Sequence, residues 1–303
     1  MKIPPLFLAA VPAIAALGAS PEQQPPIRDN RSFRTGIELI SVTATVTDRD
    51  GHLVTGLPRD AFEIDEDGER ETITQFTNER VPIGLGLLLD ISDSMFGKRI
   101  VDARAAVDRF LLELLAPEDE FFILAFNHQP HVLSRWTHDP GVVRRALDAL
   151  RPTGGTAAYD AIVESLPILA ARSRERAALL VLSDGADTAS TTTLRDLRSA
   201  LLRSDAFVYA IAIDSPDPQP INTRVNAQAL RDITGESGGR TEIVQSSADL
   251  MAATARIAEE LNSQYVLGYT SPRGADGQFH SIRVRVGGPE YRVRARKGYV
   301  ASR

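Results

Sequence analysis

A short apolar run followed at once by a polar turn limits the folds open to this chain. Residues Ile83–Leu89 are apolar or glycine, and because the run is too short for an ordinary helix it predicts a strand buried on both faces. The turn after it presents Asp90, Ser92 and Ser94. Apolar residues then recur at helical spacing, at Ile100, Val107, Leu111 and Leu114. This strand–loop–helix unit is typical of open α/β sheets, which bind ligands on such loops.

Strands and helices continue to alternate over the next 160 or so residues, which predicts an α/β domain with a doubly wound, mostly parallel sheet. Further buried strands are predicted at Glu120–Phe126, Ala177–Leu182, Phe207–Ile213 and near Thr241–Val244, with a short edge strand at His131–Trp136. Helices are predicted at Val142–Leu150, from Thr156 to about Ala171, and at Leu194–Leu202, Val225–Ile233 and Leu250–Leu261. Right-handed crossovers then place the loops after Leu89, Leu182 and Ile213 along one rim.

Oxygen-bearing side chains gather on these loops. One carboxylate and two hydroxyls at Asp90, Ser92 and Ser94 suit a hard divalent cation, although Ser and Asp are also the residues that cap helices. Thr156 follows a glycine pair, and Asp184 ends the third strand. Each has a plain alternative, because Thr156 can cap its helix and Asp184 can belong to a turn. If the loops share a rim, Asp90, Thr156 and Asp184 converge there.

The pattern Asp90-x-Ser92-x-Ser94, then Thr156, then Asp184 resembles the metal-ion-dependent adhesion site of von Willebrand factor type A domains, and the likeness spans residues 81–263. The resemblance implies a Rossmann-like fold in which Asp90, Ser92 and Ser94 hold a divalent cation. Thr156 and Asp184 would bind it directly or through water. Mg²⁺ is expected, with Ca²⁺ or Mn²⁺ as alternatives, and a carboxylate from an unidentified partner protein would fill the remaining position. In that family, ligand capture is associated with a shift of the final helix, which here would be Asp249–Asn262.

Both flanks of this domain have the alternating pattern of short strands. Residues 36–79 predict a small β unit with turns at Asp50-Gly51 and Asp67-Gly68. Residues 264–300 predict a β tail, which we expect to pair with 36–79 because the ends of a domain often lie close together. Motifs in residues 46–68, 265–269 and 296–299 resemble the flanks of a bacterial, acidobacterial-type subfamily of these proteins.

The N-terminus predicts export. Residues 1–19 combine a lysine, a short apolar stretch and a small-residue exit, which is typical of a signal peptide. Residues 20–35 have the composition of a disordered linker. The chain lacks cysteine, and we expect a periplasmic or secreted protein whose mature chain has no transmembrane segment. The formal net charge of -6 argues against a nucleic-acid partner.

Two other functions stay open. A metal-assisted hydrolase or phosphatase also places an Asp and a metal at a strand end, but position 92 is Ser, and neither a Gly-x-Ser-x-Gly elbow nor a phosphate-binding loop occurs. His128, His131 and His138 are expected on the surface. We therefore predict a binding module and not an enzyme. The third possibility is a structural interaction protein with incidental metal. Its candidate surface is an arginine ladder, predicted to form one polar face of paired strands, at Arg283, Arg285, Arg292, Arg294 and Arg296.

Overall fold

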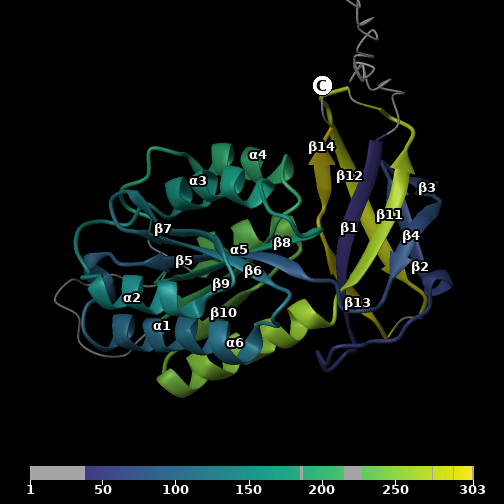
Figure 1. The fold of residues 1–303 in the computed structure, drawn as a ribbon. Helices are drawn as coiled ribbons and strands as arrows, with labels where there is room; N and C mark the ends of the chain where they lie inside the picture. Colours follow the sequence, from purple (N-terminus) through teal and green to yellow (C-terminus); the bar gives the residue numbers. More distant parts are fainter. Residues whose placement is uncertain (1–37, 185–186, 215–226, 275, 289, 302–303) are drawn as a thin grey trace, which may run out of the picture. The chain divides into compact units, whose positions relative to one another are not determined.

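The computed structural model describes residues 38–184, 187–214, 227–274, 276–288 and 290–301. The predicted signal peptide, the linker and the first two residues of the helix expected at Val225–Ile233 lie outside the described residues. Residues Gly36–Arg303 form one unit, in which a β sheet covered by helices is joined to a body made of strands (Figure 1).

The helix-covered sheet has the order β10-β9-β8-β5-β6-β7. Its central strands are buried along their whole length, as the apolar runs predict. Neighbours from β10 to β6 pair parallel, whereas β7 pairs antiparallel with β6. The predicted α/β class is confirmed and the sheet is mixed. The bounds are β5 Ile83–Asp90, β6 Glu120–Phe126, β7 Pro130–Thr137, β8 Arg176–Ser183, β9 Phe207–Ile213 and β10 Thr241–Val244.

Helices cover both faces of this sheet (Figure 1). One apolar cluster joins a sheet face to α1 Lys98–Arg109, α2 Pro140–Ala149 and α6 Ser247–Asn262. A second cluster joins the other face to α3 Ala158–Ala170, α4 Leu194–Leu202 and α5 Ala227–Ser237. The predicted helix through Leu114 is not regular, because α1 ends at Arg109 and Phe110–Leu114 forms a π-helical turn.

The strand body consists of two four-stranded sheets, β13-β1-β11-β4 and β14-β12-β2-β3. Strands from the two ends of the described chain occur in both sheets. They alternate in the first, where β11 lies between β1 and β4, and in the second they meet where β12 pairs with β2. Inward-facing apolar residues of both sheets form a third core cluster. The bounds are β1 Glu38–Thr47, β2 Phe62–Glu66, β3 Glu69–Glu71, β4 Ile73–Thr77, β11 Tyr265–Ser271, β12 Phe279–Val286, β13 Arg292–Ala295 and β14 Gly298–Val300.

The arginine ladder does not form one face of paired strands. Arg283 and Arg285 lie on β12, whereas Arg292 and Arg294 lie on β13, which belongs to the other sheet. Several of these arginines are engaged: Arg285 pairs with Asp65 at 2.8 Å, and Arg294 reaches the carboxylate of a buried glutamate in α6. The prediction was wrong because alternation reports which residues share a strand face and not which strands are neighbours.

Within the described residues, no helix is both long enough and apolar enough to cross a membrane.

Candidate metal centre

Asp90 ends β5 with its side chain buried. Its Oδ1 accepts a hydrogen bond from the backbone amide of Ser92 at 2.8 Å, and its Oδ2 accepts one from the Ser183 hydroxyl at 2.6 Å. Ser183 lies at the end of the neighbouring strand β8. The hydroxyls of Ser92 and Ser94 lie 3.0 Å apart. The turn therefore places a carboxylate and two hydroxyls at the carboxyl-terminal end of the central strand β5, where all three residues are buried.

The helix-capping alternative does not hold for these serines. Helix α1 begins after Gly97, and no side chain caps it. Ser92 precedes the short 3-10 turn Asp93–Met95 but makes no capping hydrogen bond to it. Thr156 is also not a cap, because the residue at the start of α3 is Ala157. The polar side chains on these loops are thus not accounted for by helix ends.

Backbone hydrogen bonds join the loop after β5 to the loop before α3. The amide of Asp93 donates to the carbonyl of Gly154 at 2.9 Å, and the amide of Thr153 donates to the carbonyl of Ile91 at 2.8 Å. Thr156, two residues beyond Gly154, is 3% exposed. These bonds fix the position of Thr156 relative to the serine-bearing turn.

A third loop, which follows β8, is tied to the second. The Thr188 hydroxyl accepts from the amide of Thr156 at 3.0 Å, while the amides of Thr188 and Ala189 donate back to the Thr156 carbonyl. Two carboxylates also tie the third loop to the first turn of α3. Asp187 accepts from the amide of Tyr159 at 3.3 Å, and Asp160 accepts from the amide of Thr192 at 2.8 Å.

Asp184 follows the last residue of β8 and is buried. The guanidinium of Arg99 lies 3.5 Å from its Oδ2 and also donates to the carbonyl of Ser94 at 3.0 Å. Arg99 is a buried residue of α1. The structure therefore connects Asp184 to the serine-bearing turn through a shared arginine. The residue after it, Gly185, lies outside the described residues.

Two buried carboxylates close to one another are costly. Burial, and then the negative charge of Asp184, raise the pKa of Asp90 from 3.8 to about 7, although hydrogen bonds from Ser183 and Ser92 oppose the shift. The hydrogen-bond donors to Asp90 are a hydroxyl and a backbone amide, both neutral. A divalent cation would supply the missing positive charge, and hydroxyl and carboxylate oxygens are the ligands that Mg²⁺ and Ca²⁺ prefer. The donor set fits such an ion.

Sequence reasoning missed Arg99 and Ser183. Ser183 directly precedes Asp184, so its place at a buried strand end could have drawn attention. Arg99 gave no local signal, because an arginine early in a helix is ordinarily solvated. The three histidines lie at the surface as expected, with His128 and His138 exposed and His131 half-buried. His131 contacts Asn127 at 3.3 Å, whereas His138 contacts the Asp119 carbonyl at 2.7 Å.

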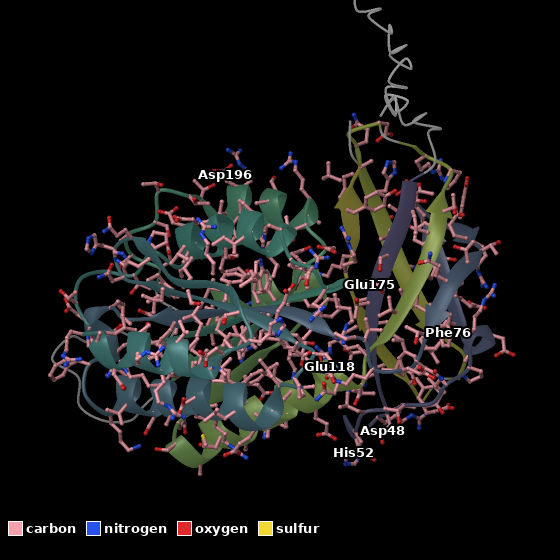
Figure 2. The ribbon with its side chains drawn as sticks, in the orientation of Figure 1. Asp48, His52, Phe76, Glu118, Glu175 and Asp196 are labelled. Atoms are coloured by element: carbon pink, nitrogen blue, oxygen red, sulfur yellow. The ribbon has the colours of Figure 1, made fainter. Side chains whose placement is uncertain are left out.

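Among the described residues, one group of three His, Cys, Asp or Glu side chains is close enough to share a metal ion, and it consists of Asp48, Asp50 and His52. Asp48 and His52 lie together in the strand body (Figure 2). The same Asp48 carboxylate accepts from the amides of Asp50 and His52, both at 2.9 Å. These contacts are those of an ordinary turn closed by an aspartate.

Part of the helix-covered region is similar in sequence to a known domain family. The sequence profile of the von Willebrand factor type A domain matches residues 85–186. No curated protein matches the chain significantly.

Similar solved structures share the fold at low sequence identity. They include the conserved hypothetical protein BatB from Bacteroides thetaiotaomicron, 19% identical, with 59% of this chain and 98% of that one covered and a TM-score of 0.50. The vWF domain of the type V pili tip protein Mfa5 from Porphyromonas gingivalis is 15% identical, with coverages of 60% and 96% and a TM-score of 0.50. A von Willebrand factor type A protein from Catenulispora acidiphila is 13% identical, with coverages of 80% and 74% and a TM-score of 0.52.

Proposed function

We propose that this chain, which carries a von Willebrand factor type A domain, is an exported binding module that captures an acidic group of a partner protein through a divalent cation. Asp90, Ser92 and Ser94 would hold the cation, and Thr156 and Asp184 would bind it directly or through water. Mg²⁺ is the ion we expect, with Ca²⁺ and Mn²⁺ as alternatives. When bound, the ion supplies positive charge and an open coordination position for an incoming carboxylate.

The observation that carries this proposal is the buried carboxylate of Asp90, which has neutral hydrogen-bond donors and a second carboxylate nearby. A cluster that served only the fold would gain from pairing that charge with a base. A site that binds a cation must instead keep its charge available. The serine hydroxyls support the same view, since they face one another and not a helix end.

The similar structures support a role of this binding module in adhesion. One of them is a domain of a pili tip protein. The pilus adhesin SpaC from Lactobacillus rhamnosus GG also has a similar structure, at 12% identity and a TM-score of 0.50, with 70% of this chain and 36% of that one covered. We propose export only from the composition of residues 1–19. We propose membership of the acidobacterial-type subfamily only from the flank motifs. A phosphatase or hydrolase stays an alternative, and assays of phosphate and acyl esters with and without Mg²⁺ test it.

Calorimetric titration with Mg²⁺, Ca²⁺ and Mn²⁺ tests the site. We expect one cation per chain, and we expect Asp90→Asn to weaken its binding at least about 100-fold. Asp93→Asn is the matched control, because Asp93 lies between the two serines but its side chain is exposed; its affinity should stay within about threefold of the parent value. Equal affinities in the parent protein and Asp90→Asn would contradict the proposal.

A second titration tests capture of the acid. The metal-loaded protein is titrated with a short peptide that carries one glutamate, and the experiment is repeated with the glutamine analogue and with chelator. We expect the glutamate peptide to bind when metal is present. We expect no binding of the glutamine analogue, and no binding of either peptide in chelator. Binding that survives the chelator would contradict capture through the ion.

A further inference from the structure

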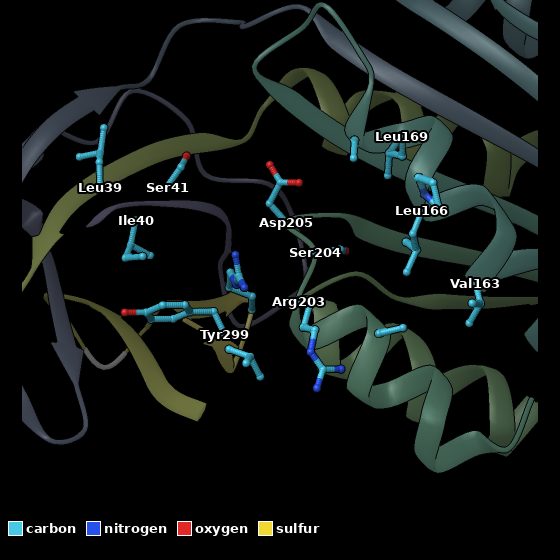
Figure 3. Close-up of a pocket in the computed structure, with 15 residues that line it drawn as sticks. Leu39, Ile40, Ser41, Val163, Leu166, Leu169, Arg203, Ser204, Asp205 and Tyr299 are labelled. Carbon is cyan, nitrogen blue, oxygen red and sulfur yellow. The ribbon is translucent and has the colours of Figure 1, made fainter. Parts of the chain in front are cut away.

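A groove of about 630 Å³ lies between the strand body and the helices α3 and α4, away from the candidate metal centre. One wall is formed by Leu39, Ile40 and Ser41 of β1, and Figure 3 shows them on the opposite side of the groove from Leu166 of α3. Tyr299 and Val300 of β14 complete the strand side. The helix side is largely apolar and consists of Val163, Leu166, Pro167, Leu169, Ala170 and Ala200.

The β1 wall of this groove is an unpaired strand edge. On one side β1 pairs with β11 from Glu38 to Ala44. On the other side β13 pairs only with Ala44–Thr47, so within the described residues the first half of β1, Glu38–Thr43, has no neighbour there. In an antiparallel ladder alternate residues turn their N–H and C=O groups toward each side. This half of β1 therefore presents backbone donors and acceptors to the groove.

Natural sheets protect such edges with charged residues or proline. Two edge strands of the same sheets follow that rule, since β3 reads Glu-Arg-Glu and β13 carries Arg292 and Arg294. In contrast, Leu39–Thr43 contains neither a charge nor a proline, and Leu39 is 52% exposed. An unprotected edge beside apolar walls is the arrangement by which proteins add a peptide strand to a sheet.

The charges of the groove indicate what kind of strand fits. Arg203 and Arg296 line it together with a single acid, Asp205, and the carboxylate of Asp205 is already engaged by Arg172. Arg203 is exposed, and its guanidinium donates to the carbonyl of Ser199 at 3.0 Å. The positive charge that remains favours an acidic side chain on the incoming segment.

We propose that this groove binds an extended segment of a partner protein that adds a strand to β1, places alternate apolar side chains against α3 and α4, and presents an acidic side chain to Arg203. The segment pairs antiparallel or parallel with Glu38–Thr43 through main-chain hydrogen bonds. The apolar walls and Arg203 supply its sequence preference. This second binding surface is independent of the cation, and it stands whether or not the metal site is correct.

Amide hydrogen exchange of the full chain tests the proposal. The probe is a soluble seven-residue peptide that alternates threonine with valine and carries one central glutamate. We expect the peptide to slow exchange at least about fivefold at the amides of Leu39–Thr43 that point away from β11, with chelator present, while exchange in the central strands stays unchanged. The analogue with lysine in place of glutamate should bind at least about tenfold more weakly. An analogue methylated on alternate backbone nitrogens should not bind, because it cannot form the ladder.

A charge reversal gives the matched control. Arg203→Glu should weaken the glutamate peptide and improve the lysine peptide, whereas Arg195→Glu, an exposed residue of α4 outside the groove lining, should do neither. The proposal is overturned by an absence of slowing at millimolar peptide or by equal binding of the methylated analogue. It is also overturned by strong protection, in the peptide-free protein, of the Leu39–Thr43 amides that point away from β11, which would mean that the edge is already filled. Protection that rises with protein concentration would assign the groove to a second copy of the chain and would also overturn it.

Discussion

The guanidinium of Arg294 in β13 lies 2.6 Å from the carboxylate of Glu260 in α6. Glu260 is 1% exposed and also accepts from the hydroxyl of Tyr209 at 2.7 Å and from the hydroxyl of Thr45 at 3.2 Å. These partners belong to β9 and β1. A single buried carboxylate thus connects the end of the last helix to the central sheet and to the strand body.

Removing this carboxylate should be costly, because it leaves Arg294 and two hydroxyls without their acceptor. We expect Glu260→Ala to lower the free energy of unfolding by about 3 kcal/mol. Denaturant unfolding measures it. The neighbouring Glu259 is exposed, so Glu259→Ala should change the free energy by less than about 0.5 kcal/mol. Similar losses in the two variants would show that the network does not stabilise the fold.

The raised pKa of Asp90 predicts how the metal-free protein responds to pH. Because the folded-state pKa of about 7 lies above the ordinary 3.8, protonation of Asp90 stabilises the fold. This contribution, at most about 4 kcal/mol, is complete below about pH 4 and is lost as pH rises through 7. The melting temperature of the parent protein in chelator should therefore fall between pH 5 and 8 relative to that of Asp90→Asn.

Mg²⁺ should remove this decline, since the ion binds the charged carboxylate and needs no proton there. The same melting series with saturating Mg²⁺ checks it. If the melting temperature of the parent protein changes with pH in parallel with that of Asp90→Asn, both with and without metal, the pKa of Asp90 is not raised and this prediction is contradicted.

Gly154 positions the loop that carries Thr156. Its φ is +79°, and an added Cβ would lie 2.9 Å from Nδ1 of His128. Gly154→Ala should destabilise the protein by about 1–2 kcal/mol and weaken metal binding, because the Gly154 carbonyl holds the amide of Asp93. Gly51→Ala is the control, since Gly51 has a φ of +89° with open space around it. Gly51→Ala should introduce the same backbone strain at positive φ but leave the metal affinity, measured by calorimetry, unchanged.

His280 predicts a second pH-dependent contribution to stability, in the strand body. Its ring nitrogens contact Asp67 at 2.8 Å and Asp276 at 3.2 Å. Burial opposes protonation, but the two carboxylates outweigh it and raise the pKa of His280 above 6.5. The stabilisation is present below pH 6.5 and is lost as pH rises through the folded-state pKa.

His280→Asn should therefore cost more stability at pH 5.5 than at pH 8.5, by roughly 1 kcal/mol. Urea unfolding at the two pH values measures the difference. His52→Asn is the comparison, because the His52 side chain is 79% exposed. A cost of His280→Asn that does not change with pH would contradict the assignment.

The sequence alone predicted the helix-covered sheet well, because its signals are local. The run at Ile83–Leu89 and the strands at Phe121–Phe126, after Glu120, and Phe207–Ile213 contain only apolar residues and glycine, which indicates burial on both faces. The candidate metal residues were found for the same reason, since each follows a strand or precedes a helix. Whether they bind an ion stays a prediction.

The strand body was harder to predict because pairing there joins residues far apart in the chain. Alternation at Val42, Ala44 and Val46 marks a half-buried strand, but it does not say that β11 pairs along β1. Glu260 was missed because it follows the exposed Glu259, and a second glutamate there is ordinarily expected to face solvent. Its four partners, Arg294, Tyr209, Thr45 and Arg240, come from four separate places in the chain.

The most direct test of the metal site is an anomalous-scattering map of crystals soaked in Mn²⁺. The account predicts one strong peak in contact with oxygens of Asp90, Ser92 and Ser94, near Thr156 and Asp184, and no peak there in crystals of Asp90→Asn. A peak only at Asp48, Asp50 and His52, or no peak in contact with Asp90, would contradict the account.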